Sequence, residues 1–376
     1  FAPIGGPAPS APSTTAPLGV KLRAFPNTPQ GREDAYASAR WLAAVIHQDE
    51  SSQRWCADRG MFDQNQVMMA HTSTNSAGGV LIPEIFSNQV IRLAEEHGIA
   101  RQTSRVIPMG GGDTLHIPRR DSGLTAAFIG ENQEGSESDS VWSDVQLSPK
   151  KAMILTRVSS ELSEDSAPAI SDQLALEMAL SFSELEDTCL LVGNGTSTHG
   201  GMQGVFPKAI DGTHTNAVQA AASGHDTLPE IDADDLINAL SKLPMYAKRN
   251  CAWYTSPTGL EVIFRAIQIA GGGTTPEMLA SAMRPSFLGF PIRVSPLLPD
   301  STSTNYNGTY MLGVGDLSLA STMAVRRDLR ISASDAPYFS SDAVALKATE
   351  RFDCNVHDLG DSGSVKSPFV VLTGTT

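Results

Sequence analysis

Residues 169–195 read AISDQLALEMALSFSELEDTCLLVGNG, which is the clearest helical pattern in the chain. Apolar side chains recur at helical spacing along one face, and Asp172, Glu177, Glu184 and Asp187 largely occupy the other faces. The pattern predicts a helix over Ala169–Val192, about 36 Å long at 1.5 Å per residue. Gly193-Asn194-Gly195 ends it sharply.

The segments on both sides of this helix contain both helix and strand patterns. Before it, strand-like runs at Thr114–Pro118 and Leu147–Ser159 flank a long polar segment, which predicts a projecting hairpin. After it, helices are expected at Ile231–Ala247 and Thr258–Ile269. Strands are expected at Cys251–Thr255, Thr309–Gly315, Leu319–Arg326, Val344–Val356 and Phe369–Leu372. Helices and strands mix without regular βαβ alternation, so the predicted class is α+β.

The N-terminal third has a different composition. Phe1–Pro17 consists of Pro, Ala, Ser, Thr and other uncharged residues, which is typical of a flexible arm. Because the first residue is Phe1 and not methionine, we expect the sequence to begin at a cut or at an artificial boundary. Helices are predicted over Arg32–Gly60 and Ile85–Glu96.

Composition excludes several classes of protein. The 376 residues include 41 % hydrophobic and 18 % charged side chains, as expected of a folded chain, and we expect no membrane span. The net charge is −14 and no basic patch is found, which argues against a protein that grips nucleic-acid phosphates. The negative net charge is explained most simply by a need for solubility. The alternative is a surface that lies beside packed nucleic acid without binding it. The four cysteines are widely spaced, which predicts neither a zinc motif nor disulfides and fits a reducing cytoplasm.

Motifs that would carry chemistry are weak. No two of the eight histidines share a helical i, i+4 face, and none lies beside a carboxylate at a metal-type spacing. Gly195–Gly200 superficially resembles a nucleophile elbow, but it follows a helix and ends His199-Gly200. We therefore predict no catalytic, cofactor-binding or metal-binding residues, and no enzyme. A hydrolase that uses Ser197 and His199 is kept as an alternative.

Taken in order, the elements resemble the Hong Kong 97 family of tailed-phage major capsid proteins over about residues 76–374. The resemblance rests on Asn75–Pro83, on the hairpin Val106–Ser159 and on the helix that ends Leu190–Gly195 before Gly204-Val205. It also rests on Phe287-Leu288-Gly289-Phe290-Pro291-Ile292, which is similar to a buried turn of the family's axial domain. Gly315–Ser318 and Phe339–Asp353 resemble its closing strands.

The resemblance implies five parts in the chain. They are an N-terminal arm with a helix (1–105), an extended loop (106–158), a peripheral domain with a spine helix (159–203), an axial domain (204–325) and the closing strands of the peripheral domain (326–376). Such subunits form pentamers and hexamers that tile an icosahedral shell around double-stranded DNA. The implied partners are sister copies, a portal protein and a cement or decoration protein. The implied place is the virion, after assembly in the bacterial cytoplasm.

The resemblance also directs attention to particular residues. Contacts between subunits are expected at Arg119, Arg120, Asp121, Glu131, Glu134, Glu137 and Asp139. Some relatives weld subunits through a lysine, an asparagine and a glutamate, but here no lysine occurs from Gly110 to Pro149. The other two positions fall near Asp342 and Thr349, so non-covalent or cement-protein stabilisation is expected. Proteolytic maturation of a precursor is expected too. The alternatives are an encapsulin-type compartment shell and a tail or baseplate protein.

Overall fold

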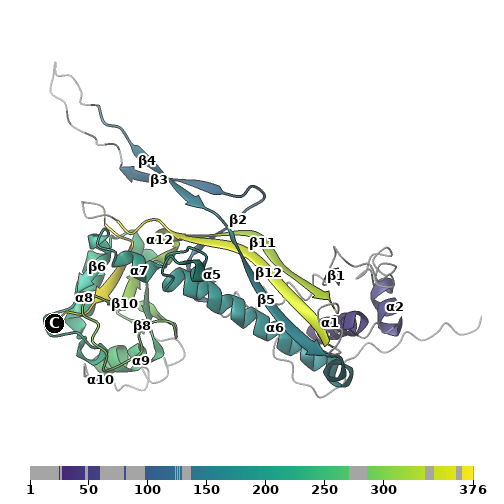
Figure 1. Ribbon diagram of the computed structural model, residues 1–376. Coiled ribbons are helices and arrows are strands. Elements are labelled where there is room, and N and C mark those ends of the chain that lie inside the picture. The colour runs from purple at the N-terminus through teal and green to yellow at the C-terminus, as the bar shows by residue number, and fades with distance from the viewer. Residues whose placement is uncertain are drawn as a thin grey trace, which may run out of the picture. The chain divides into compact units, whose positions relative to one another are not determined.

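Figure 1 shows the protein as a computed structural model, which describes residues 25, 28–46, 50–59, 80–81, 98–122, 124, 126, 128, 137–270, 286–334, 343–360 and 366–375. The chain divides into two compact units. The first contains Phe1–Glu96, Met153–Ser181 and Leu329–Glu350, and the second contains His97–Ala152, Phe182–Asp328 and Arg351–Thr376. Helices and strands are both abundant, so the α+β class is confirmed. No helix in the described ranges has the length and apolar character needed to cross a membrane.

A pair of helices belongs to the first unit. The sequence predicted one helix over Arg32–Gly60, whereas the structure has α1 (Pro29–Ile46) and α2 (Glu50–Asp58). The rings of Tyr36 and Trp55 meet edge to face with centroids 5.6 Å apart. Trp41 and Cys56 are both buried. The predicted helix Ile85–Glu96 lies outside the described residues.

A five-stranded sheet carries the longest strands. Its order is β1 (Val80–Leu81), β11 (Ser321–Ser334), β12 (Ala343–Val356) and β5 (Lys150–Ser159), and β2 (Arg105–Pro108) pairs in parallel with β11. The predicted strand Leu147–Ser159 is interrupted at Ser148-Pro149, and β4 (Val141–Leu147) belongs to another sheet. The predicted strand Leu319–Arg326 starts late, because Asp316 caps the short helix α12 (Leu317–Ala320) through the amide of Ser318.

The long helix α6 (Ser160–Leu191) has 32 residues, about 48 Å at 1.5 Å each. It begins nine residues before the predicted start and contains Pro168, a residue type that usually occurs in the first turn of a helix. Its end is fixed by two glycines: the amide of Gly204 donates to the carbonyl of Gly193 over 2.8 Å. A Cβ on Gly204 would lie 2.6 Å from the backbone of Leu191, so no larger residue fits there.

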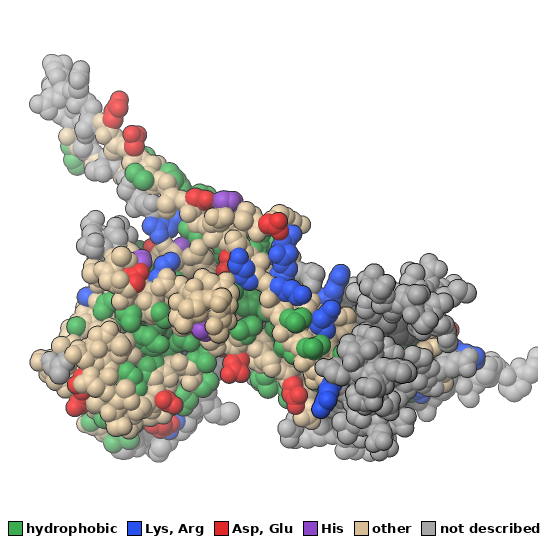
Figure 2. Space-filling model, in the orientation of Figure 1, with side chains coloured by type: hydrophobic (Ala, Val, Ile, Leu, Met, Phe, Trp, Pro, Cys, Tyr) green, Lys and Arg blue, Asp and Glu red, His purple; other side chains and the backbone are tan. Residues whose placement is uncertain are grey.

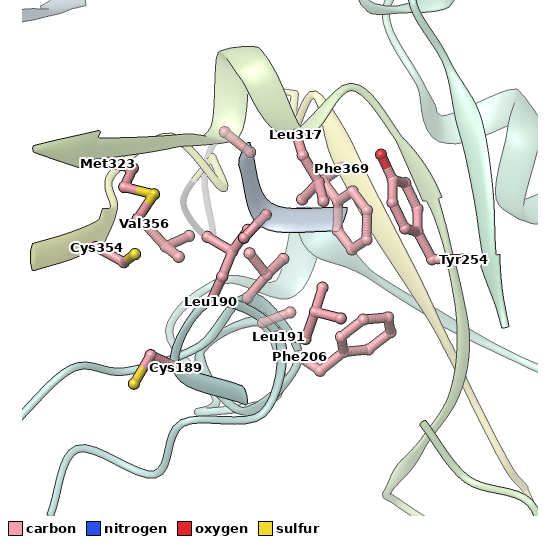
Figure 3. Packing of buried hydrophobic residues seen from close by; sticks show 14 of the residues in the cluster. Cys189, Leu190, Leu191, Phe206, Tyr254, Leu317, Met323, Cys354, Val356 and Phe369 are labelled. Atoms are coloured by element: carbon pink, nitrogen blue, oxygen red, sulfur yellow. The ribbon is translucent and has the colours of Figure 1, made fainter. Parts of the chain in front are cut away.

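A six-stranded sheet lies entirely within the second unit. Its order is β6 (Val218–Ala220), β13 (Phe369–Thr373), β10 (Tyr310–Gly315), β7 (Ala252–Thr255), β9 (Phe290–Val294) and β8 (Ser286–Phe287). Every residue of β13 and β7 is buried. Side chains alternate between two cores. Tyr254 packs with Leu190 and Phe206 in one of them (Figure 3), and Trp253 packs with Ile263 in the other. The nearly continuous apolar sequence of these strands follows from burial on both faces.

Shorter helices surround this sheet. The predicted helix Ile231–Ala247 is only α8 (Ala233–Lys242), because Pro244 cannot continue it and a separate 3₁₀ turn forms at Ala247–Arg249. The predicted helix Thr258–Ile269 is confirmed as a continuous helical run through α9 (Pro257–Gly259), a π-helical turn (Leu260–Arg265) and α10 (Ala266–Ala270). The other helices in the described ranges are α5 (Ile99–Thr103), α7 (Val205–Ala209) and the 3₁₀ turns Ser197–His199, Thr215–Ala217 and Leu228–Glu230.

The predicted turn at residues 287–292 forms, but its tip is not buried. Phe287 and Ile292 enter the core, whereas Leu288 is half exposed. The tip is exposed because β8 and β9 form an antiparallel pair that turns within two residues, so the central residues point away from the sheet.

Candidate inter-subunit surfaces

A two-stranded ribbon extends from the second unit. It consists of β3 (Leu115–Ser122) and β4 (Val141–Leu147), which pair with each other and with no other described strand (Figure 1). Leu115 and Ile117 lie opposite Leu147 and Val145. This face packs on Met109 and Ala324, so the base of the ribbon has a small core.

Polar contacts fix the base of the ribbon to the end of β12. The amide of Ser148 donates to the Asp353 carboxylate over 2.6 Å, and the side-chain amide of Asn355 donates to the carbonyl of Gln146 over 3.0 Å. Burial raises the pKa of Asp353, while the hydrogen bonds that it accepts from the backbone amides of Ser148 and Cys354 oppose this shift. Arg119 donates to the carbonyl of His357. Arg119, predicted to contact another subunit, therefore also contacts its own chain.

The remaining ribbon surface is exposed. His116 and Asp144 pair across the strands with Nδ1 and Oδ2 2.5 Å apart, and Trp142 keeps 59 % of its surface exposed. Leu124 and Phe128, near the loop tip, are exposed as well. Glu137 and Asp139, which come just before β4, are exposed too. Glu131 and Glu134, and the side chains of Arg120 and Asp121, lie outside the described residues.

One face of the five-stranded sheet is basic and partly apolar. In β5, β11 and β12 the residues of one parity, such as Ala152, Val325 and Phe352, pack into the core. Within the first unit, the opposite parity places on the other face the exposed side chains of Met153, Leu155, Arg157, Arg330 and Lys347. These five residues are called the basic face. Figure 2 shows Lys and Arg side chains in blue along these strands.

The two positions that match the family's cross-link differ in what the structure describes. Thr349 lies on β12 among the residues of the basic face, but it is buried, and its hydroxyl donates to the carbonyl of Arg330 over 3.3 Å. Asp342 lies outside the described residues. A threonine hydroxyl that is already paired has no acid–base role to offer a neighbouring amine.

A buried ionic network joins α6 to α5. Asp187 accepts from the amides of Ile99 and Ala100, and Glu186 binds the guanidinium of Arg101 through both oxygens at 2.7 and 2.8 Å. Burial raises the pKa of Asp187 to about 6, although the two amides oppose the shift. The prediction that Asp187 lies on a polar face of the helix is wrong, because its carboxylate caps α5 instead.

Cationic side chains gather beside His357. The amine of Lys208 donates to the carbonyl of Val356 over 2.5 Å, and the hydroxyl of Thr322 pairs with Nε2 of His357 over 2.8 Å. Burial, and then the charges of Arg119 and Lys208, lower the pKa of His357 to about 4. The imidazole is therefore neutral near pH 7 and acts as a structural hydrogen-bonding group.

His225 lies beside two carboxylates that are seven and ten residues away in sequence. His225, Asp232 and Asp235 bring ligand atoms within 4.8 Å of one another. Asp235 accepts from Nδ1 of His225 over 2.6 Å and from the amide of Ala222 over 2.8 Å. Asp232 accepts from the amides of Asp234 and Asp235 in the first turn of α8. The carboxylates thus form a capping network, which sequence spacing missed because loop folding brings His225 to the helix start.

The glycine loop after α6 does not form a nucleophile elbow. Ser197 begins a 3₁₀ turn, and Nδ1 of His199 lies 2.8 Å from the amide oxygen of Asn194. That oxygen also accepts from the amide and hydroxyl of Thr196. The histidine thus pairs with Asn194 and orders the loop.

The order of the strands, the long helix and the ribbon can be compared with known proteins. The family model described as "Phage capsid family" matches residues 78–359, well over half of the chain. The chain belongs to the phage capsid family. This family is structural and not enzymatic, so the chain is a capsid protein and a component of the virion.

Individual relatives agree with this assignment. The chain is 23 % identical over 331 residues to the major capsid protein of Klebsiella oxytoca phage phiKO2, covering 85 % of this chain and 73 % of that protein. The capsid of an empty GTA particle matches with a TM-score of 0.56 at 17 % identity, covering 85 % of this chain and 98 % of the other. A Mycobacterium phage Bobi structure matches with a TM-score of 0.53 at 17 % identity, covering 74 % and 91 %.

The predicted Hong Kong 97-type capsid fold is confirmed by these likenesses. They favour a phage capsid protein over the encapsulin-type alternative. The five-part division of the chain stays a prediction.

Proposed function

We propose that this chain is the major capsid protein of a tailed phage, which assembles as pentamers and hexamers into an icosahedral shell around double-stranded DNA. The shell assembles in the cytoplasm of the bacterial host, with a portal protein and, in the finished particle, a cement or decoration protein. Membership of the capsid family supports this function, and the isolated ribbon is the structural observation that carries it.

The ribbon buries too few apolar side chains to be stable along its whole length in an isolated subunit. Two-stranded ribbons are marginally stable in water, and only the base of this one is buried. Val141, Trp142, Leu124 and Phe128 remain exposed. Burial against a neighbouring copy would remove this apolar surface from water without enlarging the core of the subunit.

Charge indicates where the ribbon docks. Residues 123–140, called the loop end, carry Glu131, Glu134, Glu137 and Asp139 and no lysine or arginine. The basic face offers Arg157, Arg330 and Lys347 around two apolar side chains, Met153 at 54 % and Leu155 at 57 % exposed. We propose that the loop end of one copy binds the basic face of its neighbour, with Arg119, Arg120 and Asp121 adding contacts at the far end of β3. Such pairs set register and orientation more than they add affinity.

The overall charge suits a shell that encloses DNA. A net charge of −14 repels phosphates at short range, so the inner wall would not trap the packaged genome. Electron microscopy of the purified protein tests the function directly: closed icosahedral particles are expected. Tubes or open rings would instead indicate a tail or baseplate protein.

A charge-exchange experiment tests the docking contact. Glu137→Lys with Asp139→Lys should reduce particle yield at least tenfold, because like charges would face each other across the interface. Arg330→Glu with Lys347→Glu should do the same, and the four changes together should restore assembly. Particle yield is measured by sedimentation and electron microscopy.

The control is Glu33→Lys with Asp58→Lys, which makes the same change in charge at exposed positions of α1 and α2. It should assemble normally. If the four-fold variant remained as defective as its parents while each was folded, the loop end would not bind this face.

A further inference from the structure

The turn between β8 and β9 contains a residue in an unfavourable backbone conformation. Leu288 has φ 50° and Gly289 has φ 82°, between the paired residues Phe287 and Phe290. Among the described residues, Leu288 is the single non-glycine residue with positive φ. Two-residue turns of this kind favour Asn, Asp or Gly, since a bulky side chain in the left-handed region is strained.

Packing among the described residues does not account for this leucine. Its side chain is 51 % exposed, and a Cβ added at the adjacent Gly289 would meet nothing within 4 Å. The tip of the turn therefore lies open. Asparagine or aspartate would reduce the strain and be better solvated, so neither the local conformation nor the described part of the core explains an apolar side chain there.

Below the tip, the turn is held rigidly. The ring of Phe287 packs against those of Phe264 and Trp253 at centroid distances of 5.3 and 6.0 Å. The indole N–H of Trp253 donates to the carbonyl of Phe287 over 3.1 Å. Leu288 is thus presented from a fixed base, as a contact residue needs to be if little entropy is to be lost on binding.

A second exposed apolar residue lies on the neighbouring helix. The side-chain amide of Gln268 donates to the carbonyl of Ser286 over 3.1 Å, which ties the end of α10 to β8. The next residue, Ile269, is 62 % exposed. Residues 286–292 carry no charged side chain, so this tip offers no cation to a phosphate backbone.

We propose that Leu288 is a contact residue between two copies of this chain, inserted from the β8–β9 turn into an apolar surface of the neighbouring subunit. The proposal rests on the self-assembly of the chain proposed above. In a shell, copies of the same chain surround each subunit, and an uncharged apolar tip fits a protein surface better than nucleic acid. The strain is retained because an apolar side chain at this position is buried only in the assembly.

Substitution separates assembly from folding. Leu288→Asn and Leu288→Gly should leave the melting temperature of the unassembled chain unchanged or higher, because both residues accept positive φ. Their yield of particles should fall at least tenfold. Leu288→Met, which keeps the apolar side chain, should assemble like the parent. Leu180→Gln, at an exposed position of α6 with ordinary backbone, is the matched control and should also assemble.

Photo-cross-linking identifies the occupant. A benzophenone amino acid placed at position 288 should give covalent dimers of this chain in particles made from the protein alone, and not in unassembled protein. Normal assembly of Leu288→Asn, or cross-links to nucleic acid or within one chain only, would overturn the proposal. If the unmodified chain never formed particles, the proposed function would fail instead, so the two failures are distinguishable.

Discussion

Gly313 allows two aromatic rings to close over strand β10. A Cβ at this position would lie 2.6 Å from the ring of Phe369 and 2.9 Å from that of Phe206, and both rings are buried. The sequence predicts a strand here, but it contains no signal for this contact. The two rings come from β13 and α7, whose approach depends on the whole sheet.

Replacing this glycine tests that packing. Gly313→Ala should lower the free energy of unfolding by about 1–3 kcal/mol, the usual cost of overfilling a packed core. Gly110→Ala is the control, because its Cβ would meet nothing within 4 Å. Chemical denaturation of the unassembled chain measures both. Equal stability of the two variants would contradict the packing described for Phe206 and Phe369.

Asp187 should make stability depend on pH. Its pKa is raised to about 6 in the folded chain, so the folded state holds the proton more tightly than the unfolded state does. Its stabilising contribution is therefore fully present below pH 4 and lost as the pH rises through about 6, by about 3 kcal/mol in all. The unfolding free energy of the parent minus that of Asp187→Asn should therefore fall between pH 4 and 7. A difference that stayed constant or grew would refute this assignment.

At the scale of elements, the bounds of helices and strands were predicted well where the hydrophobic periodicity was strong. They were predicted poorly where contacts with residues distant in sequence determine the structure. Strands such as Cys251–Thr255 and the helical run after Thr258 were found almost at their true bounds. The start of α6 was missed because Pro168 resembles a helix start. Strand β2 was missed because its parallel pairing with β11 joins residues more than 200 positions apart.

The ribbon is an element whose stability should be separable from that of the rest. Leu147→Ala removes a fully buried side chain from the small core at its base. Amide hydrogen exchange should become faster in β3 and β4 while the amides of β10 and β13 stay protected. Val141→Ala, at an exposed position of the same strand, serves for comparison and should change neither. Uniformly faster exchange after Leu147→Ala would mean that the ribbon is not an independent unit.

At the scale of the whole molecule, the sequence was sufficient to recognise the capsid fold but not to locate its interfaces. The order of the weak motifs matched a family because each motif marks a turn, helix end or strand of the backbone that the family members share. The contact surfaces depend on which face each strand exposes, and parity along β5, β11 and β12 becomes known only once the core is seen. The basic face and the exposed Leu288 therefore had no signal in the sequence.

The assembled particle should hold together without covalent links between chains. The loop end has no lysine, and the hydroxyl of Thr349 is buried and paired with Arg330. Boiled particles should migrate as a single band at about the mass of one chain in denaturing electrophoresis. A ladder of multimers would show that another pair of residues reacts.

Strand β13 has a consequence for how the chain is made. It follows every other described strand in sequence, yet it lies inside the six-stranded sheet, between β6 and β10. While the polypeptide is still leaving the ribosome, the sheet lacks this inner strand, and both neighbours keep an unsatisfied edge. Translation must therefore pass residue 373 before this sheet is complete, and we expect chains truncated before β13 to be unable to assemble.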